Sequence, residues 1–395
     1  MRNFTFKGLF LAAMFMVLGS LAIQAADNDG LITKQIIVKL EKAGTLPDRI
    51  GSTKRNKITN LKIIGEINGT DWRVIREMAG RSYYNDGTDG KLAILDLSEA
   101  KIVSGGGSYL YDDSYTNDNE LGSCAFLNCS GLTSLSLPSS LTSIEREAFA
   151  GCSGLTSLSL PSSLTSIKYR AFYGCSGLTS LSLPSSLTSI EYYAFYGCSG
   201  LTSLSLPSGI TSIDWNAFSG CSGLTSLTLP SSLTSIDSGA FSGCSGLTSL
   251  TLPSSLTSID SGAFSGCSGL TSLSLPSGLT SIGDGAFRGC SGLTSIYVYT
   301  EKLPNMGSDV FDGCDAKKCT VYVPKGTYDD YWLSEFGYFE NIVEFDPTGI
   351  NNVITSNDAK ELSRYSVNGQ RLSAPTKGLN IVKYSDGSVK KVAVQ

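Results

Sequence analysis

The chain has 395 residues, with 30 lysines and arginines, 35 aspartates and glutamates and no histidine, which gives a formal charge of −5. Only 16% of the residues are charged and the balance is acidic, which argues against nucleic acid as a partner. The absence of histidine excludes Ser-His-Asp and Cys-His catalysis and the H-E-x-x-H zinc helix. Hydrophobic residues make up 41% of the sequence, so we expect a folded chain rather than a disordered one.

Segment 1–25 has the layout of a secretory signal peptide. Arg2 and Lys7 precede the apolar stretch 8–23, and small residues follow at Ala25 and Ala26. The alternative, an uncleaved N-terminal anchor, needs a longer apolar run than this one. No later stretch approaches the ~18 consecutive apolar residues of a membrane span. We therefore expect an exported chain that begins near Ala26 and has no transmembrane segment.

Residues 26–122 have no fixed period, but they contain two apolar segments, 61–64 and 92–98, that look like degenerate repeat strands. Between these segments, apolar residues at helical spacing predict a short helix with Thr70 or Asp71 as its N-cap. We interpret this region as an N-terminal cap that covers the open end of a repeat core.

From residue 123 to residue 296 the sequence is periodic, and a cysteine recurs at a constant interval from Cys129 through Cys152 and Cys175 to Cys290. Each unit reads C-S-G-L-T-S-L-[ST]-L-P-S-[SG]-[LI]-T-S-I-x-x-x-A-F-x-G, and units 221–243 and 244–266 are identical. The alternation of leucine and hydroxyl residues predicts a short strand whose leucines face a core. One unit cannot bury its Leu, Ile, Phe and Cys residues alone, whereas stacked units bury them as continuous columns. The sequence therefore predicts a mostly β solenoid, a rod a few tens of Å long at ~4.8 Å per strand.

The pattern L-x-x-L-x-L-P with the later A-F-x-x-C resembles the BspA-like class of bacterial leucine-rich repeats, from Cys129 to about Ile296. The resemblance implies a leucine-rich repeat rod and a surface-displayed adhesin that binds host extracellular proteins or other cells. Repeat folds present surfaces whose specificity lies in the variable positions, so the pattern indicates the fold more strongly than the function.

Residues 297–345 are expected to form a C-terminal cap. Segments 295–299 and 319–324 predict closing strands, and segment 328–336 predicts a short covering helix. Residues 296–345 include 4 basic and 9 acidic residues, so the acidity of the chain is concentrated in this cap.

Residues 346–395 begin as a linker rich in Pro, Gly and Asn and continue as a small all-β module. Turn signals at Asn368-Gly369 and Asp386-Gly387 predict two hairpins. The runs Y-S-V-N-G-Q-R-L and K-G-L-N-I-V-K-Y-S-D-G resemble the C-terminal sorting modules of secreted proteins in the Bacteroidota, which implies a role in export. The segment is shorter than a full β-sandwich, and the alternative is a β appendage with no export role.

Eleven cysteines in an exported chain permit two interpretations. Stacking in register brings neighbouring cysteines to ~5 Å, a separation that a disulfide tolerates. However, the repeat cysteines share one inward position and their number is odd, which favours a ladder of buried thiols. Cys314 and Cys319 are the pair most worth testing. No C-x-x-C occurs, and one cysteine in each long repeat unit is not a ligand spacing, so we expect no metal and no cofactor.

The positions that vary between units mark the candidate site. The second residue of the turn x-x-x is aromatic in three adjacent units, and the residue after Phe is aromatic in two of them. A solenoid stacks equivalent positions above one another. We therefore expect an exposed aromatic patch formed by Tyr169, Tyr192 and Trp215 in one column, with Tyr173, Tyr193 and Tyr196 beside it. Exposed tyrosines and tryptophans favour partner contact because they bury a large area at low entropy cost. The alternative is that these rings only cover the core and stack on one another.

We interpret the protein as a secreted or cell-surface binding protein without catalysis, which adheres to host extracellular protein or to other cells through the repeat surface. Identical units in tandem, with Ser and Gly in the variable positions, are predicted spacers that add length. The alternatives are a glycan-binding component of a nutrient-capture system and a structural surface rod. A carbohydrate hydrolase is disfavoured, because the acidic positions form an exposed row of one sign without an apolar pocket. These positions are Glu191, Asp214, Asp237 and Asp260.

Overall fold

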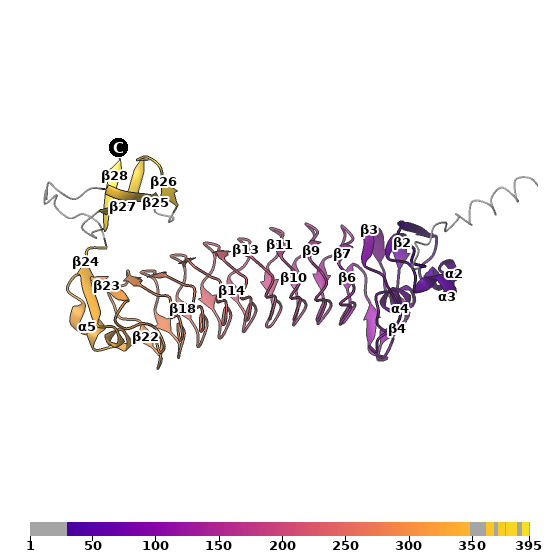
Figure 1. Ribbon diagram of the computed structural model, residues 1–395, viewed down its shortest axis with the longest axis horizontal. Helices are drawn as coiled ribbons and strands as arrows, with labels where there is room; N and C mark the ends of the chain where they lie inside the picture. Colours follow the sequence, from indigo (N-terminus) through magenta and orange to yellow (C-terminus); the bar gives the residue numbers. More distant parts are fainter. Residues whose placement is uncertain (1–29, 348–360, 367–369, 376, 385–388, 395) are drawn as a thin grey trace, which may run out of the picture.

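The computed structural model describes residues 30–347, 361–366, 370–375, 377–384 and 389–394. Across residues 30–347 it is a rod of stacked coils with a helical cap at each end (Figure 1). The predicted signal peptide and the turns Asn368-Gly369 and Asp386-Gly387 lie outside the described residues. The predicted fold class, a leucine-rich repeat solenoid with a small all-β module, is confirmed.

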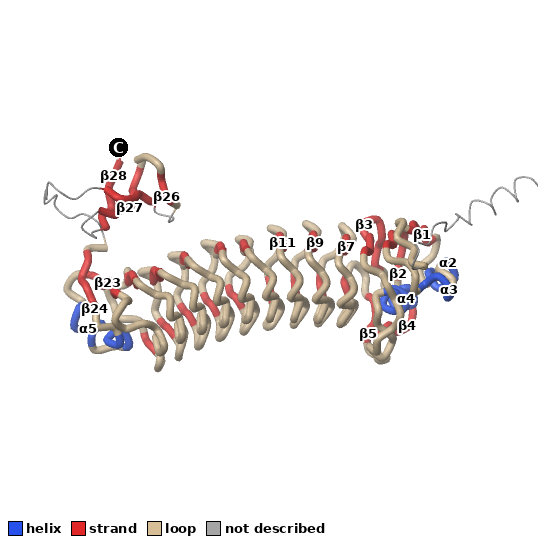
Figure 2. Tube along the Cα trace, in the orientation of Figure 1, coloured by secondary structure: helices blue, strands red, loops and turns tan. Residues whose placement is uncertain are grey.

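Each repeat unit contributes two short parallel strands, and the rest of the unit is turn and loop (Figure 2). The S-L-S strands of the repeats are β7 (Ser134–Ser136), β9 (Ser157–Ser159), β11 (Ser180–Ser182), β13 (Ser203–Ser205), β15 (Ser226–Thr228), β17 (Leu250–Thr251), β19 (Ser272–Leu275) and β21 (Ser295–Val298). They follow β1 (Ile36–Leu40), β2 (Asn60–Ile67) and β3 (Ile94–Ile102), and they precede β23 (Thr320–Pro324) and β24 (Asn341–Phe345). We call this surface the strand face; its sheets run β1-β2-β3-β7-β9-β11, then β13-β15, then β17-β19-β21-β23-β24.

The second strand of each unit belongs to a second set of parallel sheets, in the orders β12-β10-β8-β6 and β14-β16-β18-β20-β22. These strands are β6 (Glu120–Leu121), β8 (Ser143–Ile144), β10 (Ser166–Ile167), β12 (Ser189–Ile190), β14 (Ser212–Ile213), β16 (Ser235–Ile236), β18 (Ser258–Ile259), β20 (Ser281–Ile282) and β22 (Asn305–Met306). We call the segment that follows each of them, x-x-x-A-F-x-G, the turn edge.

The strand register places identical repeat positions side by side. Leu135 pairs with Leu158, which pairs with Leu181, and all three leucines are buried. Ser157 and Ser159 on either side of Leu158 are exposed. The alternation of leucine and serine therefore separates core from solvent as the sequence predicts.

A column of phenylalanines runs through the interior of the turn edge. From Phe126 to Phe311, consecutive rings lie 4.9 to 5.9 Å apart between centroids and within 16° of parallel. Stacking of this kind adds to the burial of the rings, so each unit is stabilised by the unit on either side.

The repeat cysteines form the predicted buried column, and all eleven cysteines, Cys314 and Cys319 included, are free thiols. From Cys152 to Cys314, each Sγ in the column donates to the carbonyl oxygen of the Phe in the preceding coil, as Cys152 does to Phe126. The distances are 3.0 to 3.4 Å. Burial raises the pKa of Cys175 and of Cys221 to about 12. These thiols therefore act as small core residues whose one polar hydrogen is satisfied.

The glycine of C-S-G is required by the close approach of neighbouring coils. A Cβ on Gly154 would lie 2.1 Å from the carbonyl oxygen of Ser130 in the coil before it, and Gly177 has the same relation to Ser153. Any larger residue would push the coils apart, which explains why this glycine recurs in every unit.

The N-terminal cap supplies hydrogen-bond donors to the first coil. Along the turn edge every second N–H donates to a carbonyl of the following unit, as Phe126 N does to Ala148, so the first coil has carbonyls that face the cap. The helix α4 (Gly69–Met78) meets them: Trp72 Nε1 donates to the carbonyl of Ala125 at 3.0 Å, and Arg76 donates to that of Cys124 at 2.6 Å. The predicted cap and its helix are thus present, and they end the polar ladder of the core.

The N-cap of α4 is Asn68, and the prediction of Thr70 or Asp71 in that role is wrong. The side chain of Asn68 accepts from Thr70 N, and the carboxylate of Asp71 accepts from Asn68 N at 3.0 Å. Asp71 stands three residues into the helix, where a carboxylate reaches back to complete a capping box.

The N-terminal cap also contains two short helices, α2 (Leu46–Arg49) and α3 (Ser52–Arg55), and the hairpin of β4 (Gly105–Leu110) and β5 (Ser114–Thr116).

The C-terminal cap supplies an acceptor to the last coil. Segment 328–336 is not one helix, as predicted, but α5 (Tyr328–Trp332) followed by the 3-10 helix η1 (Glu335–Tyr338). Ser334 is extended between them, and its hydroxyl accepts from Phe336 N, which starts η1 anew. Glu335 accepts from Val310 N at 3.3 Å.

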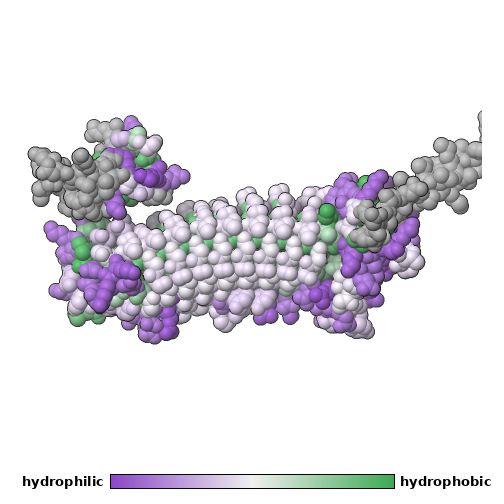
Figure 3. Space-filling model, viewed as in Figure 1, coloured by the Kyte–Doolittle hydropathy of each residue, from purple (hydrophilic) through white to green (hydrophobic). Residues whose placement is uncertain are grey.

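On the face shown in Figure 3, strongly hydrophilic residues gather on the two caps and along the lower edge of the repeats, whereas the rest of the repeat surface has intermediate hydropathy. The small C-terminal module is an antiparallel sheet in the order β26-β25-β27-β28, formed by β25 (Glu361–Ser366), β26 (Arg371–Leu372), β27 (Gly378–Tyr384) and β28 (Val389–Val394). None of the helices in the described part of the chain has the length and apolarity to cross a membrane. The boundaries of the predicted domains stay predictions.

Candidate functional site

The six aromatic residues predicted as a binding patch form one contiguous cluster on the turn edge, which we call the aromatic cluster. It consists of Tyr169, Tyr173, Tyr192, Tyr193, Tyr196 and Trp215. Tyr173 and Tyr196 are one unit apart and stack at 5.0 Å with 6° between their planes. Tyr169 and Tyr192 are likewise one unit apart, at 4.9 Å and 46°.

Trp215 does not continue the pair of Tyr169 and Tyr192 in the way that the sequence pattern suggests. Its ring contacts Tyr193 instead, at 5.8 Å between centroids. Tyr193 has a left-handed backbone, with φ of 59°, and its ring also contacts Tyr169 and Tyr196. Tyr193 is therefore the centre of the cluster, because it joins the two pairs of tyrosines to the tryptophan.

Arg170 organises the cluster, and sequence reasoning missed it. Its guanidinium carbon lies 5.0, 5.1 and 5.4 Å from the ring centroids of Tyr169, Tyr173 and Tyr193. A guanidinium at these distances is attracted by the ring faces and holds the rings together. Arg170 also lies 3.8 Å from the carboxylate of Glu147. A cation within the run of aromatic turns was the signal that could have revealed this role.

Exposure divides the cluster into a base and a tip. Trp215 is 55% exposed and Tyr192 is 47% exposed, whereas the other four rings are half-buried. Four rings pack against the solenoid and against one another, and two present free surface.

The backbone under the cluster is strained. The third residue of the turn is left-handed in each unit, with φ of 53° to 66°, and this conformation costs a residue with a side chain about 1 kcal/mol relative to glycine. The position is occupied by Glu147, Arg170, Tyr193 and Asn216 in the first four units and by Gly239, Gly262 and Gly285 in the next three. Strain of this kind clusters at functional sites. The change from side chains to glycine along the sequence was the visible sign of it.

The acidic row is less exposed than predicted. Glu191, Asp214 and Asp237 are half-buried in the turn edge, and only Asp260 is exposed. Burial, followed by the neighbouring carboxylates, raises the pKa of Asp214 and of Asp237. The negative charge of Glu191 is balanced, because its carboxylate pairs with Lys168 at 3.2 Å and accepts a hydrogen bond from the N–H of Tyr169. No group of three potential metal ligands occurs in the described residues.

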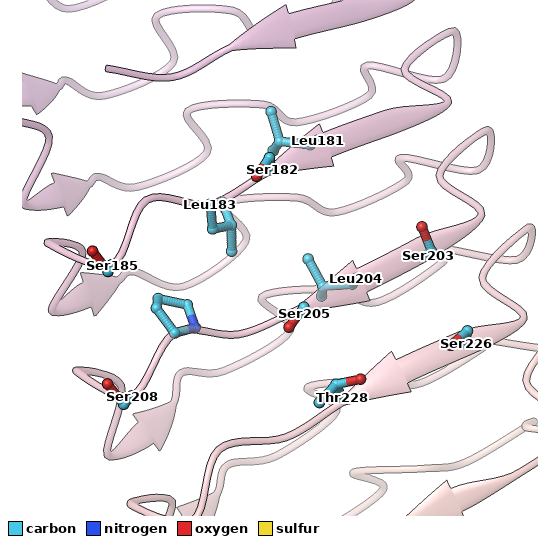
Figure 4. Close-up of a pocket in the computed structure, with 11 residues that line it drawn as sticks. Leu181, Ser182, Leu183, Ser185, Ser203, Leu204, Ser205, Ser208, Ser226 and Thr228 are labelled. Atoms are coloured by element: carbon cyan, nitrogen blue, oxygen red, sulfur yellow. The ribbon is translucent and has the colours of Figure 1, made fainter. Parts of the chain in front are cut away.

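A groove of about 480 Å³ lies on the strand face, where the sheet order is interrupted between β11 and β13 (Figure 4). Leu183 and Pro207, which are half-buried, provide apolar surface over the buried Leu181 and Leu204. Serines from three neighbouring units and Thr228 line the rest. None of the aromatic cluster borders it. The groove combines aliphatic surface with hydroxyl groups, and the sequence pattern contains no sign of it because the lining residues are the repeat consensus.

The repeat region of the chain matches a known protein family. The family described as "BspA type Leucine rich repeat region" matches residues 119–230 and 216–329, which together make up more than half of the chain. The chain belongs to the BspA-type leucine-rich repeat family. The stacked coils described above are therefore BspA-type repeats. No match was found among curated proteins.

Solved structures of bacterial leucine-rich repeat proteins resemble this BspA-type chain. A protein from Bacteroides ovatus is 28% identical with a TM-score of 0.51, and the match covers 65% of this chain and 62% of that one. A Treponema pallidum protein is 26% identical over 46% of this chain and 85% of that one, with a TM-score of 0.30. A leucine-rich cell surface protein from Faecalibacterium prausnitzii is 22% identical over 73% and 79%, with a TM-score of 0.29. This chain thus spans less than two thirds of the Bacteroides ovatus protein.

Proposed function

We propose that this BspA-type protein is a secreted or cell-surface protein that adheres to an extracellular protein through the aromatic cluster, without catalysis. One observation carries the proposal: Tyr192 and Trp215 present free ring surface at a turn position that is occupied by Ser238 and Ser261 in the next two units. The rings beneath them are already packed around Arg170. Binding therefore costs little additional ordering.

The composition of the cluster suits a protein partner. Tyrosine, tryptophan and arginine are the residues that most often dominate the energy of protein interfaces. Arg146, whose side chain is 64% exposed, lies beside Tyr169 and adds a charged rim to the exposed rings. Adhesion would then combine a buried aromatic centre with charge contacts at its edge.

Export and surface location are part of the proposal. The predicted signal peptide 1–25 supports export, and a surface position agrees with the description of the Faecalibacterium prausnitzii relative as a cell surface protein. We also propose a sorting role for the C-terminal module, which its resemblance to the C-terminal sorting modules of secreted proteins in the Bacteroidota supports.

A glycan is the second candidate partner, and the groove on the strand face favours it. Serine hydroxyls beside the half-buried Leu183 and Pro207 offer hydrogen bonds next to apolar surface, which are the two kinds of contact that a sugar ring makes. The third candidate, a structural rod, is supported by the identical units 221–243 and 244–266, which add length without adding a new surface.

The test is binding of the chain from Ala26 onward to an array of extracellular-matrix proteins and polysaccharides. Tyr192→Ala/Trp215→Ala is the test variant. Ser238→Ala/Ser261→Ala is the matched control, because it alters the same turn position in two units outside the cluster. Thermal unfolding of all three proteins establishes that they are equally folded.

We expect the wild type and the control to bind a protein target and the test variant to bind it at least about tenfold more weakly, as truncation of interface anchors does. Equal binding by all three proteins would remove the aromatic cluster as the site. Binding only to polysaccharides would favour the glycan candidate, and no binding at all would favour the structural rod.

A further inference from the structure

The strand face ends in an open edge at each end of the rod. β1 is the first strand of its sheet and β24 is the last strand of its own, both contain five residues, and each is parallel to its neighbour. An edge strand presents N–H and C=O groups that can pair with another chain. The helices α4 and η1 close the turn edge at the two ends, but in the sheet order no described strand follows β24 or precedes β1.

The side-chain columns of the strand face end at these two edges without a residue, in the described part of the chain, that covers their last members. The inward column that contains Leu158 starts at Ile36 and ends at Ile342, and both of these residues are only partly buried. The outward column beside it starts at Ile37, which is 60% exposed, and ends at Val343, which is 46% exposed. Each edge thus leaves β-branched apolar side chains without the neighbour that every unit inside the rod has.

We propose that copies of this chain associate head to tail, with β24 of one copy pairing in parallel with β1 of the next. In the register that continues the columns, Ile342 lies against Ile36 of the next copy and Val343 lies against its Ile37. All strands of the strand face run in the same direction, so this pairing adds one more step to the existing ladder. The partner is therefore a second copy of this chain, and the two ends act as different halves of one interface.

Charge complementarity supports the same register. Glu340 and Lys34 each stand two residues before the first paired isoleucine of their edge, at Ile342 and Ile36, and both are exposed. Both residues lie in the bends just before β1 and β24, so the continued register places opposite charges at the same end of the pairing. The acidic character of the C-terminal cap, with 9 acidic and 4 basic residues in 296–345, therefore faces a lysine rather than a like charge.

The geometry implies an open assembly. An interface between two different ends does not close on itself when the ends point in opposite directions along a rod, so it generates a filament. A single strand pairing with a few apolar contacts buries a small area and is weak by itself, so we expect association to depend on concentration.

The test is sedimentation velocity of the chain from Ala26 onward over a range of concentrations, with electron microscopy of the concentrated sample. Ile37→Lys blocks the β1 end and Val343→Lys blocks the β24 end. Both positions are exposed, so the variants are expected to fold, which circular dichroism checks. The wild type should form chains of rods joined end to end, and each variant alone should stay monomeric. An equal mixture of the two variants should form dimers and nothing larger, because each variant retains one intact end.

Lys34→Glu should weaken association, and Lys34→Glu combined with Glu340→Lys should restore it. A wild type that is monomeric up to its solubility limit would overturn the proposal, as would association that neither lysine variant reduces or dimers formed by one variant alone. Tyr192→Ala/Trp215→Ala should associate like the wild type. Its result separates this interface from the proposed adhesion site.

Discussion

The units with aromatic turns, 152–220, and the spacer units, 221–266, differ on the surface and agree in the interior. The phenylalanine column passes through both, with ring separations of 4.9 to 5.1 Å from Phe149 to Phe218 and of 5.4 to 5.5 Å from Phe218 to Phe287. The turns above this column hold Arg170 and Tyr193 in one region and glycines in the other, on the same left-handed backbone. The stacked interior therefore determines the conformation of the coil. The coil then tolerates side chains at its turn edge whose left-handed backbone is strained.

The largest expected effect comes from truncating a phenylalanine of the interior that the two regions share. Phe195→Ala in the aromatic region and Phe241→Ala in the spacer region should each lower the free energy of unfolding by about 3–5 kcal/mol, because both rings are fully buried between two others. Chemical denaturation of the two variants measures the loss. A much smaller loss for one of them would show that the two regions do not share one interior.

A smaller effect tests the backbone of the turn edge. Gly262 has φ of 62°, and an added Cβ would meet no atom closer than 3.9 Å, so Gly262→Ala should cost about 1 kcal/mol from backbone strain alone. Ser261→Ala, one residue earlier, serves as the control. An unchanged midpoint of thermal unfolding for Gly262→Ala would contradict the strain that we assign to Arg170 and Tyr193.

The smallest effect concerns the acidic row and depends on pH. The pKa of Asp237 is raised in the folded protein, so the folded state binds more protons than the unfolded state just above the ordinary pKa of aspartate. Stability therefore falls as pH rises through that window, and the penalty persists at neutral pH. Asp237→Asn should raise stability at pH 7 by less than about 1 kcal/mol, given the solvent screening at this half-exposed site.

The same substitution should have no effect below the pKa of the unfolded aspartate, where the native carboxyl is already neutral. Glu191→Gln is the contrast in the aromatic region, and it should lower stability slightly because it removes the ion pair with Lys168. Thermal unfolding at pH 7 and at low pH measures both variants. A stabilising Glu191→Gln would remove this difference between the two regions.

Three features follow from the amino-acid sequence alone: the repeat, the direction in which its side chains face and the residues of the aromatic cluster. A constant period with buried Leu, Ile, Phe and Cys has one efficient solution, which is to stack the units in register, so this part of the structure needs no information from outside the unit. The positions of Tyr173 and Tyr196 followed directly from that stacking.

The contacts between the rings of successive coils, by contrast, depend on the tertiary structure. The left-handed turn placed Tyr193 between Tyr196 and Trp215, and it put Arg170 among three tyrosines. These contacts join residues of successive coils. They depend on a left-handed backbone at Arg170 and Tyr193, a conformation that arginine and tyrosine do not favour. Likewise, the open edges at β1 and β24 exist because a stack has ends, which is a property of the assembled rod and of no single unit.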